Sequence, residues 1–486
     1  MSLSSAMSNA ISGLTATTRA TEVVSTNISN KSVAGYSRRE LELSSRVYSG
    51  NGGGVAIDGV QRTVNAGLLA DNRLAEAAAS QSDTVATFHA AIENALGTAD
   101  KAGSLSSLLT AFDSALTSAA ARPDSDTRLN GVLDAATTLT DKINSVSKTI
   151  ADARTGADKA IARDVDQLNT ALANVAKLNR QITLLSAQGE DTSSLIDARQ
   201  AAIDDIAGIV PIQEVARDNG QVALFTKGGA TLLDGVSPAT IGFQATAAVT
   251  ADMSVGNGAL STLSINGRTL STTEMNVFSG GSLAANFELR DKIAPSYQGQ
   301  IDAVARDLYD RFADPALDPT LTAGQAGLFT DGQSALLTTN EIGFASRIAV
   351  NAAVDPDSGG DLWRIRAGIN AADGGSSGNA TLIQNMSAVL SEKRAPVSSA
   401  ISNTPRSMLG LAADLTSTAS SRRISADAAA LQDRTHADSL KTALLAQGVD
   451  TDTEMQAMLA LQTAYSANAK VLQAVNNMLD QILELK

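Results

Sequence analysis

Apolar and small side chains repeat in alternating steps of four and three residues at both ends of this 486-residue chain. Such a repeat is typical of helices that pack along a common seam. Each stripe spans about 37 Å at the rise of an α-helix. Because the stripes have equal lengths and lie at opposite ends of the chain, we predict an antiparallel coiled-coil pair. The stripes consist of Leu3, Met7, Ala10, Leu14, Thr17, Thr21, Val24 and Ile28, and of Met458, Leu461, Tyr465, Asn468, Leu472, Val475, Leu479 and Ile482.

Two paired helices bury little apolar surface by themselves, and chain ends usually fray unless a partner holds them. We therefore expect the stripes to assemble with further copies or neighbouring subunits. The alternative is that each stripe is only the buried face of an ordinary globular helix. The predicted assembly interface comprises Leu3, Met7, Leu14, Val24, Ile28, Met458, Leu461, Tyr465, Leu472, Val475, Leu479 and Ile482.

Between the ends, long helical patterns surround a region of alternating hydrophobicity with Gly and Asn turns. Its hairpin signals include Asn266-Gly267. The expected fold is mainly α with β insertions: a terminal coiled coil, an elongated helical-bundle domain and a β-rich outer domain. The predicted parts are an axial helix pair of residues 1–30 with 452–486, a joint loop and strand at 31–63, a helical domain of 64–210 with 283–313 and 397–446, a β-rich insertion at 211–282 and a mixed segment at 314–396.

Composition argues against several classes of function. The formal net charge is −14 and no basic stripe occurs, so nucleic acid is not expected as a partner. Cysteine is absent and both histidines, His89 and His436, lie in Ala-rich helical patterns, which places them on helix surfaces and predicts no metal site. No catalytic or cofactor-binding motif is found; the Gly-rich run at 50–54 fits neither nucleotide-binding motif and is interpreted as a flexible turn. The sequence therefore predicts no catalytic residue, no cofactor and no enzyme.

The start of the chain does not have the pattern of a Sec signal peptide, and no stretch approaches the ~18 consecutive apolar residues of a membrane helix. No membrane insertion is therefore expected. By these tests alone the chain would be cytoplasmic.

The stretch NISNKSVAGYSRR, residues 27–39, follows the first stripe. Asn27 and Asn30 have short amides suited to a helix end, and Gly35 permits a turn closed to most residues. Tyr36 combines a ring that can be buried with a polar hydroxyl, and Arg38 can meet an acid. We interpret these five residues as a joint that aims the terminal helix pair relative to the body. The alternative is an ordinary helix end followed by a loop.

The same stretch resembles the N-terminal signature of the bacterial flagellar axial proteins, a family of rod, hook and junction subunits. Asn27, Ile28, Asn30, Gly35, Tyr36 and Arg38 match it. Further stretches are similar to the junction members of this family: GGGVAIDGVQR at 52–62, LIDARQAAIDDIAGIV at 195–210, and the terminal helix from Gly448 onward.

The resemblance implies a structural subunit that connects hook to filament and polymerises through its terminal helices. It also implies export through the flagellar type III system, which replaces the cytoplasmic expectation with a secreted, flagellar location. Implied partners are further copies of the chain, the hook protein, a second hook–filament junction protein and an export chaperone. A hook or rod subunit is the alternative within this family. A cytoplasmic helical binding module or export chaperone is the alternative of another class.

Overall fold

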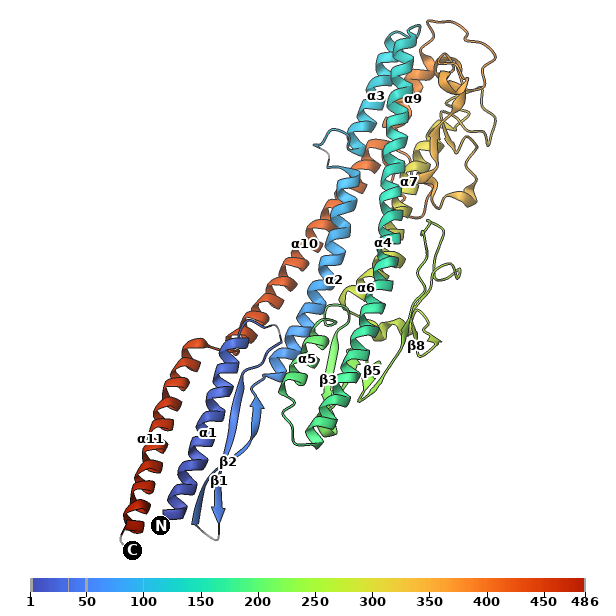
Figure 1. Ribbon diagram of the computed structural model, residues 1–486. Helices are drawn as coiled ribbons and strands as arrows, with labels where there is room; N and C mark the ends of the chain where they lie inside the picture. Colours follow the sequence, from blue (N-terminus) through green and yellow to red (C-terminus); the bar gives the residue numbers. More distant parts are fainter. Residues whose placement is uncertain (1–2, 34, 49–50, 99, 485–486) are drawn as a thin grey trace.

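The computed structural model describes residues 3–33, 35–48, 51–98 and 100–484. The molecule is elongated and mainly helical, with small antiparallel sheets beside the helices (Figure 1). This architecture confirms the predicted mainly α fold with β insertions. The α-helices are α1 (Leu3–Asn30), α2 (Ala66–Leu96), α3 (Leu105–Ala121), α4 (Asp126–Ala187), α5 (Ser193–Asp204), α6 (Gly281–Glu288), α7 (Ala294–Phe312), α8 (Arg364–Ala367), α9 (Thr381–Ser391), α10 (Met408–Ala446) and α11 (Thr451–Glu484).

The first and last helices lie side by side, and both ends of the chain meet at one tip of the molecule (Figure 1). The two helices therefore run antiparallel, as predicted. They approach closely where Gly13 of α1 meets Asn468 of α11. A Cβ atom at Gly13 would lie 2.8 Å from Asn468 Nδ2, so a larger residue there would force the Asn468 side chain to move.

A long hairpin of β1 (Arg39–Tyr48) and β2 (Asn51–Arg62) runs along α1. The Gly-rich run was expected to be a flexible turn, and for residues 51–54 this is wrong because they belong to β2; residue 50 lies outside the described residues. Gly54 adopts a φ of 91°, and a Cβ there would lie 2.1 Å from Ser12 Oγ. The glycine thus allows the hairpin backbone to approach α1, where Ser12 Oγ accepts a hydrogen bond from Val55 N.

The long helix α4 is the backbone of the body. Its apolar side contributes Leu129, Val132, Ile143 and Ile150 to a large core shared with α3, α7 and α9. Further along, α4 contributes to a second core with the β-rich insertion. Helix α10 packs along α2 through small side chains such as Ala75, Ala79 and Ala437, which explains why this Ala-rich sequence needs few aromatic residues.

The β-rich insertion contains two small sheets. One has the order β3 (Ile212–Ala216), β4 (Val222–Thr226), β5 (Thr231–Asp234) and β6 (Ser237–Pro238), and the other has β7 (Ile241–Gly242), β8 (Ser264–Ile265) and β9 (Arg268–Thr269). The predicted turn at Asn266-Gly267 joins β8 to β9, and both residues have positive φ, as that turn requires. A third pair, β10 (Phe329–Asp331) with β11 (Ile348–Val350), lies in the mixed segment.

The expected surface position of the histidines is wrong for His89. His89 is buried, and its Nδ1 lies 3.0 Å from the hydroxyl of Tyr297 on α7. Burial lowers the pKa of His89, aided by the nearby charge of Arg422. His89 thus serves the packing of α2 against α7. His436 is exposed, as expected.

Candidate assembly interface and joint

The predicted seam residues differ in how far a single chain covers them. Val24 and Val475 are buried, whereas Tyr465 and Ile482 are 50% and 54% exposed. The remaining predicted interface residues are half-buried: Leu3, Met7, Leu14, Ile28, Met458, Leu461, Leu472 and Leu479. The pairing of α1 with α11 therefore covers this seam only in part.

Helix α11 also exposes apolar side chains that the seam analysis missed. Met455, Leu459, Val471, Met478 and Leu483 are each 45% exposed or more. A heptad pattern selects the apolar residues on one side of a helix only. The signal that could have found these residues was the apolar content around the whole circumference of α11. A surface helix of a monomer usually shows one apolar stripe and a polar remainder. Helix α11 thus has exposed apolar surface that is available for contact with other chains.

The joint is organised around the side-chain amide of Asn27, which is fully buried at the end of α1. Its Nδ2 donates to the carbonyl of Arg39 at 2.9 Å and to Glu454 Oε2 at 3.1 Å. Its Oδ1 accepts from the hydroxyl of Tyr36 at 2.8 Å and from Arg39 N at 3.0 Å. Both donors and both acceptor positions of the amide are therefore used.

Arg38 links the joint to the last helix. Its Nε donates to Glu454 Oε1 at 2.7 Å, and Nη1 contacts Glu40. Partial burial opposes the charged form, but the bonds to Glu454 and Glu40 outweigh it and raise the pKa of Arg38. Burial is also the main reason that the pKa of Tyr36 is raised, so its hydroxyl stays protonated and donates to Asn27.

A second cluster ties the hairpin to the body. Asp197 on α5 receives Arg39 Nη2 at 2.8 Å and Arg62 Nε at 2.8 Å, so one carboxylate joins β1 and β2 to the body. The Arg39 guanidinium also lies 4.9 Å from the centre of the Tyr36 ring. These contacts make a continuous polar connection from the terminal helices to α5.

The other two predicted joint residues have local roles. Asn30 Nδ2 donates to the carbonyl of Thr26 and so satisfies a group near the end of α1. Gly35 has a φ of 78° and lies against α5, where a Cβ would be 3.1 Å from the Cβ of Ala201. The structure therefore places Asn27, Asn30, Gly35, Tyr36 and Arg38 in one region.

Sequence reasoning missed the acids that complete the joint, Glu454 and Asp197. Both lie far along the chain from Asn27, and no local pattern marks either as a joint residue. The adjacent arginines at 38 and 39 were the available signal, because clustered cations near a polar turn require acidic partners.

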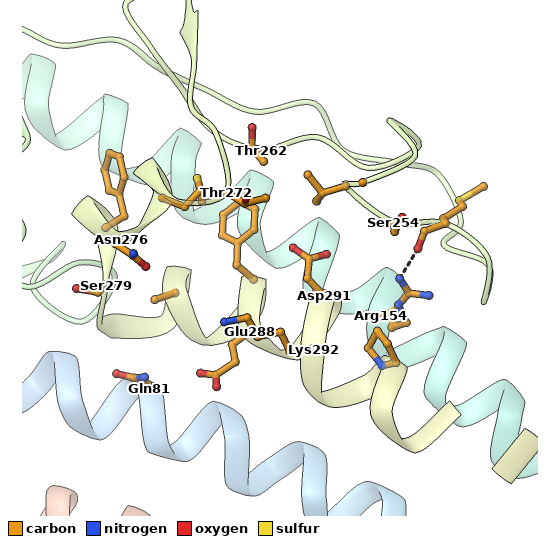
Figure 2. Close-up of a pocket in the computed structure, with 18 of the residues that line it drawn as sticks. Gln81, Arg154, Ser254, Thr262, Thr272, Asn276, Ser279, Glu288, Asp291 and Lys292 are labelled. Carbon is orange, nitrogen blue, oxygen red and sulfur yellow. Dashed lines mark hydrogen bonds between the residues drawn. The ribbon is translucent and has the colours of Figure 1, made fainter. Parts of the chain in front are cut away.

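A cavity of about 650 Å³ lies beside α6, between loops of the β-rich insertion and the helices (Figure 2). Arg154 reaches this cavity, but its guanidinium donates to the carbonyls of Thr250, Met253 and Arg290 at 2.7–2.9 Å. Burial is the main cause that lowers the pKa of Arg154. Arg154 thus holds the loop at 250–253 against α4.

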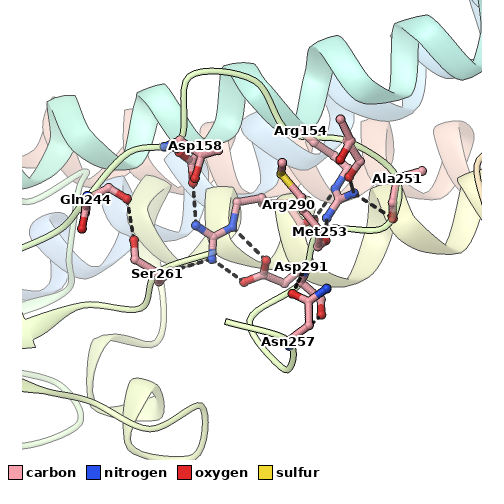
Figure 3. A network of polar contacts seen from close by, with 12 residues as sticks. Arg154, Asp158, Gln244, Ala251, Met253, Asn257, Ser261, Arg290 and Asp291 are labelled. Carbon is pink, nitrogen blue, oxygen red and sulfur yellow. Dashed lines mark hydrogen bonds and ion pairs between the residues drawn. The ribbon is translucent and has the colours of Figure 1, made fainter. Parts of the chain in front are cut away.

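A buried ion pair lies close to Arg154 and contacts another loop of the β-rich insertion (Figure 3). Arg290 lies in a π-helical segment, Leu289–Ile293, between α6 and α7. Its Nη1 meets Asp158 Oδ1 of α4 at 2.6 Å, and both side chains are fully buried. Nη2 donates to the carbonyl of Ser261 at 2.9 Å. The π-helical segment thus positions the Arg290 guanidinium so that it contacts both α4 and the β-rich insertion.

Within the described ranges, no cluster of His, Cys, Asp or Glu is arranged to hold a metal ion. Likewise, no helix of the described chain is both long and apolar enough to cross a membrane.

Two family models match parts of the chain. Residues 89–319 match the helical domain of flagellar hook-associated protein FlgK, and residues 441–485 match the C-terminal domain of the flagellar basal body rod FlgEFG proteins. The first match includes α4 and the β-rich insertion, and the second includes all of α11. Together they span more than half of the chain.

The chain is similar to flagellar hook-associated protein 1 of Salmonella typhimurium, with 30% identity over 240 residues that cover 48% of this chain and 43% of the relative. The protein of the same name from Escherichia coli is 28% identical over 242 residues, covering 48% and 44%. The chain thus spans less than half of the length of these curated relatives. A solved structure of the flagellar hook junction protein FlgK from Burkholderia pseudomallei aligns with a TM-score of 0.45 and 20% identity, covering 54% of this chain and 47% of that one. The chain thus carries a match to the helical domain of FlgK and is similar to flagellar hook-associated protein 1 over 48% of its length.

Proposed function

We propose that this protein is a structural subunit of the bacterial flagellum that connects the hook to the filament. It polymerises through its terminal helices and acts through interfaces, without catalysis. The observation that carries this proposal is the apolar surface that α11 leaves uncovered after pairing with α1, including Tyr465 and Ile482. The names of the relatives support the location at the junction.

The proposed mechanism couples folding to assembly. The terminal helices are largely disordered in the dilute monomer and become ordered when they bundle with neighbouring subunits, which limits premature polymerisation. Circular dichroism of dilute monomer and of assembled protein tests this step. Helical content should rise on assembly, whereas fully formed terminal helices in the dilute monomer would contradict the mechanism.

The proposed route to this location is export through the flagellar type III system, with an export chaperone as a cytoplasmic partner. At its destination the protein contacts further copies, the hook protein and a second junction protein. We also propose that the terminal pair lies innermost in the assembly, with the helical and β-rich parts defined in the sequence analysis layered outward from it. In this proposal the twelve predicted interface residues form the seam through which the terminal helices assemble. The five joint residues aim the terminal helix pair relative to the body.

Imaging of a tagged copy on purified flagella tests the location. A narrow band between hook and filament supports the junction role. Label along the hook or within the rod would instead support a hook or rod subunit, an alternative favoured by the match of α11 to the rod-protein domain. Label confined to the cytoplasm would indicate a binding module or chaperone.

A further inference from the structure

Glu454 is an unusual residue for its position in the molecule. It lies in the first turn of α11, where acids are normally exposed and interact with the helix dipole, as the exposed Asp452 does. Glu454 is instead completely buried, and the buried residues of α11 are Glu454 and Val475. A buried carboxylate is costly unless it is paired, so the contacts that pair it must be specific.

Both partners of Glu454 belong to the joint. Oε1 accepts from Arg38 Nε at 2.7 Å, and Oε2 accepts from Asn27 Nδ2 at 3.1 Å. Removal of α11 would leave one donor of the buried Asn27 amide without its partner. It would also leave Arg38 with Glu40, an acid whose side chain is 57% exposed, as its remaining ion-pair partner.

The dependence also runs in the opposite direction. Opening of the joint would move Arg38 and Asn27 away from Glu454 and deprive its carboxylate of both partners. Two elements that each require the other to satisfy buried polar groups are thermodynamically coupled, and such coupling is reciprocal. Docking of the last helix and closure of the joint therefore form one cooperative event.

We propose that Glu454 is a positioning residue that couples docking of α11 to closure of the joint. Because Arg39 and Arg62 connect the joint to Asp197 on α5, the direction of the terminal helices relative to the body is set when α11 is docked. The proposed coupling links two parts of the same chain. It is therefore a separate inference from the proposed assembly between chains.

Hydrogen exchange of the full-length chain tests the proposal through two reporter amides. Arg39 N donates to Asn27 Oδ1 and reports on the joint, and Glu454 N donates to the carbonyl of Asp450 and reports on the first turn of α11. In the wild-type protein, both reporters should be protected, or both unprotected, at every protein concentration. Protection of Arg39 N while the first turn of α11 exchanges freely would overturn the proposal.

Two substitutions separate coupling from simple loss of stability. Arg38→Met leaves Glu454 buried without its cation and should speed exchange at both reporters at least tenfold. Adding Glu454→Gln removes the unpaired charge and should restore most of the protection at Glu454 N. Asp452→Asn, an exposed change in the same turn, removes only an interaction with the helix dipole and should change either rate less than about fivefold. Independent, multiplying effects of the two substitutions would contradict the coupling.

The central strand β4 serves as an internal reference for folding of the body. If Arg38→Met does not fold, Glu454→Gln alone decides the matter: tenfold faster exchange at Arg39 N with β4 protected supports the proposal, and an unchanged rate overturns it. The rates are compared at a protein concentration at which both wild-type reporters are protected. Either outcome then reports on contacts within the chain and not on its location on the flagellum, so failure of this inference and failure of the proposed function are distinguishable.

Discussion

The amide of Asn27 donates a hydrogen bond of 3.1 Å to the carboxylate of Glu454, across 427 positions of the chain, and both side chains are fully buried. The contact joins the end of the first helix to the start of the last. Around it, Tyr36 and Arg39 use the remaining hydrogen-bonding positions of Asn27. The joint is therefore built from both ends of the chain.

Asn27→Asp keeps the shape of the side chain but replaces its two donors with a second carboxylate against Glu454. We expect the free energy of unfolding to fall by about 3 kcal/mol at neutral pH, because a buried acceptor loses its donor and like charges meet. Urea unfolding measures the change. Asn30→Asp, which alters one half-buried local contact, should cost under about 1 kcal/mol. Equal losses in the two variants would contradict the central role of Asn27.

Arg290→Met should destabilise the β-rich insertion strongly, because it leaves Asp158 buried without its cation. Loss of one partner of a buried ion pair typically costs about 3–5 kcal/mol. The double variant Arg290→Met with Asp158→Asn should recover part of this loss in thermal unfolding. A double variant less stable than Arg290→Met would show that the charge pairing is not the reason for the effect.

Asp302 should titrate well above an ordinary aspartate. Burial raises the pKa of Asp302 to about 6, although the backbone amides of Ala345 and Gly343 and the side chain of Gln298 donate to it and oppose the shift. The folded protein then holds this proton more tightly than the unfolded chain does. The contribution of Asp302 to stability therefore falls as pH rises from about 4 to about 6, by roughly 3 kcal/mol.

The carboxyl carbon shift of Asp302 in an NMR titration measures this pKa directly. Asp302→Asn provides the control, because the stability difference between wild type and this variant should decline over the same pH window and stay constant above it. A midpoint near 4 for Asp302 would contradict the expected shift.

Gly54→Ala should weaken the packing of the hairpin on α1. The new Cβ would meet Ser12 Oγ, and the φ of 91° is unfavourable for alanine. Faster hydrogen exchange at Val55 N, which donates to Ser12 Oγ, would report the change. Gly131→Ala is the matched control: this glycine lies within α4 with open space around it, so alanine should stabilise the protein by about 0.5–1 kcal/mol. A neutral Gly54→Ala would show that the close approach is not required.

The helices and their antiparallel terminal pairing were predictable because a seven-residue apolar repeat encodes which side of a helix is buried. The hairpin turn at Asn266-Gly267 was predictable for a similarly local reason, since positive φ favours these residues. His89 was misplaced because its burial depends on Tyr297, which is distant in sequence. Residues 51–54 were misplaced because the space that glycine leaves is filled by α1, and no neighbouring residue reveals this.

The sequence predicted the amides, the tyrosine and the arginines of the candidate joint, but not its acids. The amides, the tyrosine and the arginines occur within one short stretch, so their shared location follows from the chain. Glu454 and Asp197 come from α11 and α5, and their selection among the 51 acids of the chain depends on tertiary packing. The ion pair of Arg290 with Asp158 was missed for the same reason.

The most direct measurement of assembly through the terminal helices compares Ile482→Asp with Gln481→Asp in cells that lack the native chain. Ile482 is 54% exposed in the single chain, so a charge there spares the pairing of α1 with α11 but opposes burial against a neighbour. Electron microscopy of the flagella should show no junctions and no filaments for Ile482→Asp, with folded protein released into the medium, and normal flagella for the adjacent exposed control. Normal junctions built from Ile482→Asp would contradict assembly through this surface.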